Sequence, residues 1–181
     1  MTESRWAARV LAAGIVQGGV AFVVMGVLLY LAVFGVPAAS RIVAAGGAGN
    51  WMIVGLIGFA LVGVIGVAMS ALFYHHLEVT LRRPYEGWRN YAAWAHLILG
   101  GGGSSAAALL AAYGGYQAGA ALLPATAPIF GGGKDALYVH VNILGPLALP
   151  IAALAGIGLL GFFVGGVGYV TAWWSAMRPK K

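Results

Sequence analysis

The chain has 181 residues, of which 61% are hydrophobic and only 8% charged, and its mean hydropathy is +0.91. Soluble domains carry about 25% charged residues, so this composition excludes a soluble domain that covers its own core. The formal net charge of +6 does not indicate nucleic-acid binding, because the basic residues flank apolar segments. The absence of cysteine from the sequence excludes thiolate metal sites, iron–sulfur clusters and cysteine nucleophiles.

Four apolar segments follow one another along the chain, at about residues 7–36, 51–81, 91–123 and 137–177. Each is longer than the roughly 20 apolar residues that a helix needs to cross a bilayer. Helices are favoured because lipid offers no partner to free backbone groups. We therefore predict an all-α membrane protein in which residues 1–181 form a single transmembrane domain, a bundle of four transmembrane helices. The connection at 37–50 is small and flexible in composition, and the one at 124–136 contains two prolines and a glycine triplet. Neither predicts a folded domain.

Basic residues are concentrated at the two ends of the chain and between the second and third segments. They are Arg5, Arg9, Arg82, Arg83, Arg89, Arg178, Lys180 and Lys181. The other two connections hold one basic residue each, Arg41 and Lys134. Because basic loops stay in the cytoplasm, we expect a multi-pass protein of the cell membrane with both termini cytoplasmic.

Small residues recur at helical spacing in all four segments. The series are Gly14 and Gly18; Gly55, Gly58 and Gly66; Gly100, Ser104, Ala108 and Ala112; and Gly158, Gly161, Gly165 and Gly168. Such faces let helices approach closely in lipid, where the hydrophobic drive for association is absent. Two interpretations stay open: packing within the bundle, or docking of other membrane subunits. The run at 100–103 also predicts a kink, or the close approach of a planar ligand or another backbone.

Few ionisable residues lie inside the apolar segments, and they are candidates for function. They are His75, His76, Glu78, His96 and His140. No charged residue lies at the centre of a predicted helix, which argues against a self-sufficient ion transporter. The sequence also contains no P-loop, nucleophile elbow or paired carboxylates, so we expect no catalytic activity of its own.

His75 and His76 lie near the C-terminal end of the second segment. His96 lies at similar depth on the antiparallel third segment. One histidine from each of two such helices is how a bundle holds haem b, and Arg82 and Arg83 would lie near the propionates. Only one of the adjacent histidines can face the iron, and we predict His76. The alternative is that these histidines are interfacial and bind headgroups, Glu78 or backbone.

A metal site of His75, His76, Glu78 and His96 is disfavoured, because adjacent side chains on a helix point about 100° apart. We therefore predict no resident metal ion. For His140, which lies at the other end of the fourth segment, we expect a structural role.

Residues 73–100, FYHHLEVTLRRPYEGWRNYAAWAHLILG, form the most distinctive stretch. A histidine-bearing helix end, a basic aromatic loop and a second histidine helix resemble small membrane subunits that accompany haem-copper terminal oxidases, and those of prokaryotic cytochrome b assemblies. The resemblance covers about one sixth of the chain. It implies an accessory role, because four histidines in two distant groups cannot supply both a haem and a copper centre.

These observations lead us to expect a small non-catalytic subunit of a larger energy-transducing, respiratory membrane complex, whose partners are other membrane subunits and the lipid bilayer. One alternative is a haem b-binding electron-transfer subunit that uses His76 or His75 with His96. The other is a small transporter or channel whose pore forms between identical protomers.

Overall fold

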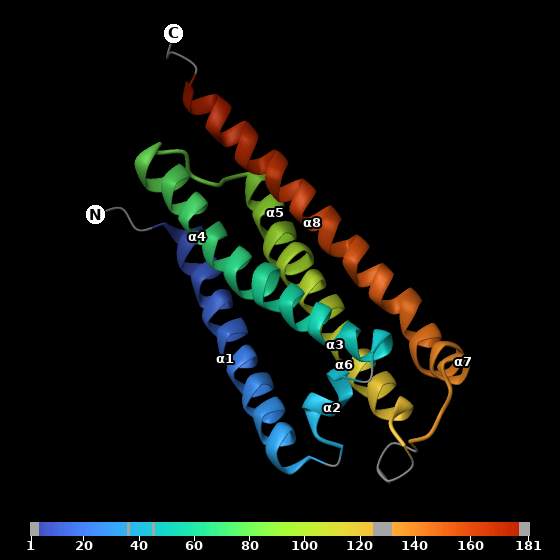
Figure 1. The fold of residues 1–181 in the computed structure, drawn as a ribbon. Coiled ribbons are helices and arrows are strands. Elements are labelled where there is room, and N and C mark those ends of the chain that lie inside the picture. Colours follow the sequence, from blue (N-terminus) through green and yellow to red (C-terminus); the bar gives the residue numbers. More distant parts are fainter. Residues whose placement is uncertain (1–3, 36, 45, 125–131, 178–181) are drawn as a thin grey trace. The chain divides into compact units, whose positions relative to one another are not determined.

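The computed structural model describes residues 4–35, 37–44, 46–124 and 132–177. Within these ranges the regular structure is entirely helical (Figure 1). Four stretches are long and apolar enough to cross a membrane: Arg5–Phe34, Gly47–Thr80, Trp88–Leu122 and Ala136–Met177. The prediction of an all-α chain with four long apolar helices is therefore confirmed.

Three of the four stretches alternate between α-helix and wider π-helical segments, written η. The first stretch is the single helix α1 (Arg5–Phe34), which is followed by the short helix α2 (Ala39–Ala44). The second stretch consists of α3 (Gly47–Gly58), η1 (Phe59–Gly66), α4 (Val67–His75) and η2 (His76–Thr80). The third consists of α5 (Trp88–Trp94), η3 (Ala95–Gly103) and α6 (Ser104–Leu122). The fourth consists of α7 (Ala136–Val139), η5 (His140–Leu144) and α8 (Gly145–Met177).

The connection between the first two stretches differs from the prediction of a flexible loop over 37–50. It contains α2, and α3 begins at Gly47 rather than at Trp51. The physical reason is burial, because Ile42 of α2 is 0% exposed, and burying an aliphatic side chain stabilises even a short helix. Gly46 adopts a φ of 95°, a conformation open to glycine, and so lets the chain turn into α3.

The chain divides into two compact units. The first unit comprises the described parts of residues 1–18, 61–104 and 155–181, and the second comprises those of 19–60 and 105–154. Each unit therefore takes one piece from every long stretch. The core of the first unit contains Trp6, Val10, Val67, Ala71, Tyr74, Leu77, Tyr85, Ala93 and Ala172. A core cluster of the second unit contains Ala118, Ala121 and Val139.

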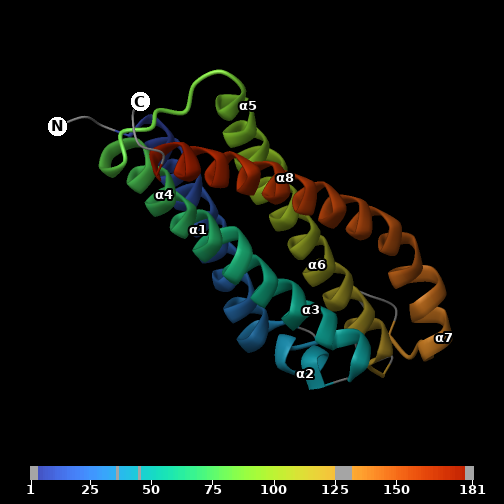
Figure 2. The same ribbon diagram turned by 90° about the horizontal axis from the view of Figure 1, so that it is seen from above.

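In the first unit, a loop connects η2 to α5 (Figure 2), and the chain turns at the second residue of this loop, Arg82. Arg82 has a φ of 50°, and this turn lets the backbone N–H of Arg83 donate to the carbonyl of Leu77 at 2.9 Å. Such a turn is a common way to end a helix, and a proline often follows it; here it is Pro84. The chain then brings Tyr85 back into the core, where it is 5% exposed.

The glycine face of α8 packs inside the first unit. Gly158, Gly161, Gly165 and Gly168 are all buried. A Cβ atom on Gly161 would overlap the backbone of Gly100, and one on Gly158 would overlap Ser104. The predicted close approach at the run 100–103 is therefore an approach of backbone to backbone, and the run lies in the π-helical segment η3 rather than in a regular α-helix.

Small residues also bring the elements of the second unit together. A Cβ atom on Gly55 of α3 would overlap the backbone of α6 at Ala108 and Ala112. A Cβ atom on Gly115 of α6 would overlap the backbone of Met52. These contacts correspond to the packing interpretation of the small-residue series.

Candidate functional site

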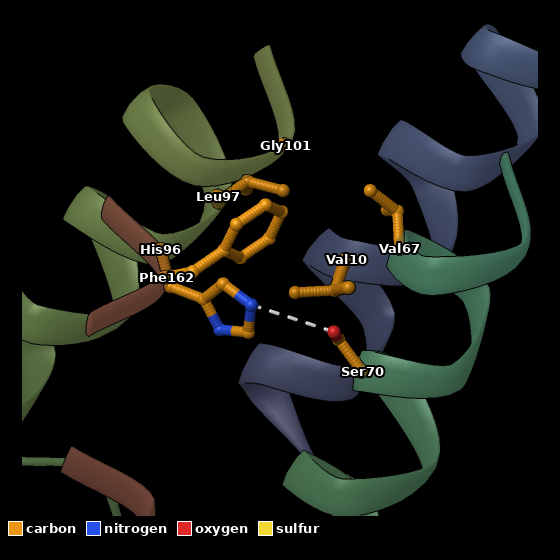
Figure 3. Close-up of a pocket in the computed structure, with 7 residues that line it drawn as sticks. All are labelled: Val10, Val67, Ser70, His96, Leu97, Gly101 and Phe162. Atoms are coloured by element: carbon orange, nitrogen blue, oxygen red, sulfur yellow. Dashed lines mark hydrogen bonds between the residues drawn. The ribbon is translucent and has the colours of Figure 1, made fainter. Parts of the chain in front are cut away.

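His96 is the buried histidine of the first unit. It lies in η3 and is 7% exposed. Its Nδ1 atom is 3.1 Å from the hydroxyl oxygen of Tyr74, and its Nε2 atom is 3.4 Å from that of Ser70. Figure 3 shows the contact with Ser70. Ser70 and Tyr74 are four residues apart on α4, so they present their hydroxyl groups on one face of the helix.

The hydrogen bonds around His96 indicate which of its two ring nitrogens carries the proton. The Ser70 hydroxyl donates to the carbonyl of Gly66 at 2.9 Å, as serine commonly does one turn back in a helix. Its single proton is thereby used, so its oxygen accepts the proton of His96 Nε2. A neutral imidazole has one donor and one acceptor, and Nδ1 therefore accepts from Tyr74. Both ring nitrogens are thus occupied within the chain.

Aromatic rings surround the imidazole. The ring of Phe162 lies 5.5 Å away at 72°, and that of Tyr169 lies 5.2 Å away at 86°. These near-perpendicular arrangements are favoured between aromatic rings. A Cβ atom on Gly165 would come within 2.5 Å of His96 Cβ, so the glycine face of α8 makes room for the histidine.

A cavity of about 490 Å³ opens beside this histidine in the first unit. Its walls come from the second and fourth helical stretches, together with His96 from the third. The lining residues are Gly66, Ser70, Phe73, His76, Leu77, His96, Phe162, Tyr169, Val170 and Trp173. A second, much smaller cavity of about 10 Å³ also touches Ser70 and His96 (Figure 3). It has room for about one water molecule.

The structure brings together some of the residues that the sequence suggested for haem b. His76 and His96 line the same large cavity. His75 is exposed and is not among the lining residues. Arg82 is exposed and Arg83 is half-buried in the connection after η2, and neither lines the cavity.

Glu78 stabilises the start of α1. Its carboxylate accepts hydrogen bonds from the Ser4 hydroxyl and from the backbone N–H of Trp6. The Ser4 oxygen in turn accepts from the backbone N–H of Ala7 at 3.0 Å, which makes Ser4 an N-cap. A carboxylate at a helix N-terminus also interacts favourably with the helix dipole. Among the described residues, no group of three or more His, Cys, Asp or Glu side chains is placed to hold a metal ion.

Two arginines join helices in the first unit. The Arg89 guanidinium donates to the carbonyl of Thr171 at 3.1 Å, and a second contact of 3.4 Å reaches the hydroxyl of Ser175. The guanidinium of Arg9 lies 4.9 Å from the ring centroid of Trp6 and 5.2 Å from that of Trp94. These distances are those of cation–π contacts, so both arginines help to hold neighbouring helices together.

Tyr85 brings a third hydroxyl group close to Tyr74 and Tyr169, from the connection after η2. Its ring centroid lies 5.0 Å from that of Tyr74, and its hydroxyl has no hydrogen-bond partner within the described part of the chain. Burial, and then the neighbouring Tyr169, raise the pKa of Tyr85 above its ordinary value, although Arg89 acts in the opposite direction. This tyrosine therefore stays neutral over the physiological pH range.

His140 belongs to the second unit. It is exposed and lines a separate cavity of about 360 Å³ together with residues such as Trp51 and Leu144. No contact in the structure assigns it a role in ligand binding.

Sequence reasoning identified His96 but missed the residues that hold it. The spacing of Ser70 and Tyr74 by one helical turn, facing a histidine on a neighbouring helix, was an available signal. No signal in the sequence indicated that Phe162 and Tyr169 pack against the imidazole, because ring contacts between distant segments depend on the tertiary fold. Comparison with protein-family models, with curated proteins and with solved structures gives no match.

Proposed function

We propose that the four apolar stretches cross the cell membrane, with the termini and the connection at 81–87 in the cytoplasm. The exposed surface supports this proposal: Phe22 is 81% exposed and Leu29 is 69% exposed on α1, and Phe163 is 71% exposed on α8. Large apolar patches of this kind are unfavourable in water and mark contact with lipid or other proteins. The basic residues at the chain ends and in that connection set the orientation.

We further propose that the protein is a small, non-catalytic membrane subunit of a larger energy-transducing complex, respiratory in type and related in role to the accessory subunits of terminal oxidases. The observation that carries this proposal is the His96 cavity. Residues 73–100, which resemble such subunits, also provide Phe73, His76, Leu77 and His96 of the cavity wall. The resemblance and the cavity therefore fall on the same segment.

Partner subunits would pack against small residues that the described part of the chain leaves uncovered. A Cβ atom added to Gly19 or Gly26 of α1, or to Gly156 or Gly166 of α8, would meet nothing within 4 Å. The buried glycine face of α8 is already covered within the first unit, so partner helices would use these open positions instead.

A haem b-binding electron-transfer subunit is the second candidate, and one observation favours it: His76 and His96 line one cavity of about 490 Å³. The hydrogen bonds of His96 oppose it. Iron binds the lone pair of an imidazole nitrogen, and here Nδ1 accepts from Tyr74 while Nε2 carries the proton. Haem binding would have to break one of these bonds.

Purification from native membranes in a mild detergent tests the subunit proposal. We expect other membrane chains to copurify, and their masses identify the complex. A protein that remains a lone monomer in native membranes would rule the proposal out. The visible spectrum of the same preparation tests the haem alternative, which requires a b-type α band on reduction that is lost in His96→Ala and retained in His140→Ala.

Cysteine labelling tests the topology. A cysteine placed at Gly47 or Gly132 is expected to react with an impermeant reagent added outside the cell, and tags at either terminus are expected to be cytoplasmic. Labelling of both cysteines only from the cytoplasm would contradict the four-span arrangement.

A further inference from the structure

The large cavity beside His96 combines apolar walls with polar atoms on its surface. Phe73, Phe162, Tyr169 and Trp173 supply aromatic side chains, whereas Ser70, His76 and His96 supply polar groups. A lipid acyl chain would cover these polar groups without offering them any hydrogen bond, which is unfavourable. The polar groups of this cavity therefore indicate an occupant that has its own hydrogen-bonding atoms.

The residues of the cavity wall limit the charge that the occupant can carry. Within the part of the chain that the structure describes, no Lys, Arg, Asp or Glu lines the cavity, so a phosphate, a carboxylate or an ammonium group would enter without a counter-charge from these residues. Burying an unpaired charge is costly. The occupant is therefore an uncharged molecule that is largely apolar.

The hydrogen-bonding groups favour an acceptor on the occupant. His96 Nε2 donates to Ser70 over a long 3.4 Å contact, so its proton can be redirected to a ligand oxygen at little cost. The hydroxyl of Tyr169, another lining residue, is buried and has no hydrogen-bond partner among the described residues, and the Tyr169 ring centroid lies 4.8 Å from that of Tyr74. Two donors are thus available to a carbonyl oxygen.

A flat ring suits the remaining walls, because aromatic side chains stack on rings or meet them edge-on. The volume of about 490 Å³ lies within the usual range for small-molecule sites. We propose that this cavity binds the head ring of a lipid-soluble quinone, with a ring carbonyl accepting from His96 Nε2 and Tyr169 and with the apolar tail extending into the bilayer. The inference rests on the proposed membrane function and names the ligand of its site.

Quinone binding keeps the proton of His96 on Nε2, where the hydrogen bonds of the structure assign it. A carbonyl oxygen takes the proton on Nε2 and leaves the bond from Tyr74 to Nδ1 intact, whereas iron needs a nitrogen lone pair. The observations therefore favour a quinone over haem at the same cavity.

The test uses the full chain reconstituted in phosphatidylcholine vesicles and titrated with a decyl-substituted benzoquinone. We expect saturable quenching of tryptophan fluorescence, which Trp173→Phe reduces because Trp173 lines the cavity. We also expect the carbonyl infrared band of the bound quinone to shift to lower frequency. Decanol, which has the same tail but no ring, is expected not to compete.

Variants locate the site. His96→Ala is expected to weaken binding about tenfold or more and to abolish the infrared shift, because it removes a buried donor. Since loss of His96 also disturbs packing, Tyr169→Phe provides a second test. It removes a hydroxyl that lacks a good hydrogen bond, should fold normally, and is expected to weaken binding several-fold. His140→Ala, in the second unit, is the matched control and should bind like the native chain.

Three results would overturn the inference. One is quenching that does not saturate, or that is unchanged in both His96→Ala and Tyr169→Phe. Another is equal competition by decanol, which would make the cavity a lipid groove. The third is a haem absorption band that disappears in His96→Ala. Copurification of partner subunits is measured separately, so failure of quinone binding and failure of the proposed subunit function are distinguishable.

Discussion

The two units of the chain differ in the contacts that hold each one together internally. In the first unit, a glycine face is combined with a buried polar and aromatic cluster around His96 and Tyr74. In the second unit, glycine lets backbones approach closely, as Gly55 does against Ala108. Interhelical hydrogen bonds and close backbone packing are two ways in which helices associate. This chain uses both, and the buried His96 lies in the first unit with Ser70 and Tyr74 at its two ring nitrogens.

The largest effect is expected from blocking the glycine face of α8. Gly161→Leu should destabilise the first unit by about 3 kcal/mol or more, because the new side chain would collide with the backbone of Gly100, which cannot rotate away. Unfolding in mixed detergent measures the change. Gly166→Leu is the control, since nothing lies within 4 Å of its Cβ position. Equal stability of the two variants would show that the face is not packed.

A smaller change tests the second unit. Gly115→Ala adds one methyl group against the backbone of Met52 and should cost about 1–3 kcal/mol. Gly58→Ala, whose Cβ would lie 3.6 Å from the Cβ of Ala108 in ordinary contact, should be close to neutral. The thermal midpoints of the two variants in detergent provide the measurement. If Gly115→Ala left the thermal midpoint unchanged, the second unit would not depend on close backbone packing.

The polar cluster of the first unit is tested by removing single hydroxyl groups. Tyr74→Phe should cost about 1–3 kcal/mol, because it leaves the buried Nδ1 of His96 without its donor. Tyr85→Phe should cost almost nothing, because the Tyr85 hydroxyl has no partner among the described residues. Chemical unfolding of both variants under one set of conditions checks the difference. If Tyr85→Phe were the more damaging change, the hydrogen bond to His96 would not be what stabilises this unit.

The smallest effects are expected in the connection of the first unit between η2 and α5. Arg82→Gly should stabilise the protein by about 1 kcal/mol, because Arg82 has a φ of 50° that favours glycine. Gly87→Ala should have an effect of similar size and opposite sign, because Gly87 has a φ of 56°. Thermal midpoints again measure both, and two shifts of the same sign would contradict this account of the turn.

The four long helices were predictable from the sequence, because long apolar runs are visible without any knowledge of tertiary contacts. The close approach at residues 100–103 was also predictable, since only glycine lets another backbone come so near. The short helix α2 was not predictable from the sequence. Its composition is that of a loop, and the burial of Ile42, which stabilises it, involves residues distant in sequence.

For the candidate site, too, some features follow from the sequence and others depend on the tertiary structure. The sequence alone determined that His96 lies inside an apolar helix, since a polar residue in such a run is visible by inspection. Only the tertiary structure decided that Ser70 and Tyr74 occupy both of its ring nitrogens, that His76 shares its cavity, and that Arg82 and Arg83 do not line that cavity. The physical reason is that composition and periodicity specify where a helix runs and which residues share its face. The partner that each face meets depends on how the helices pack against one another, which is a property of contacts between distant segments.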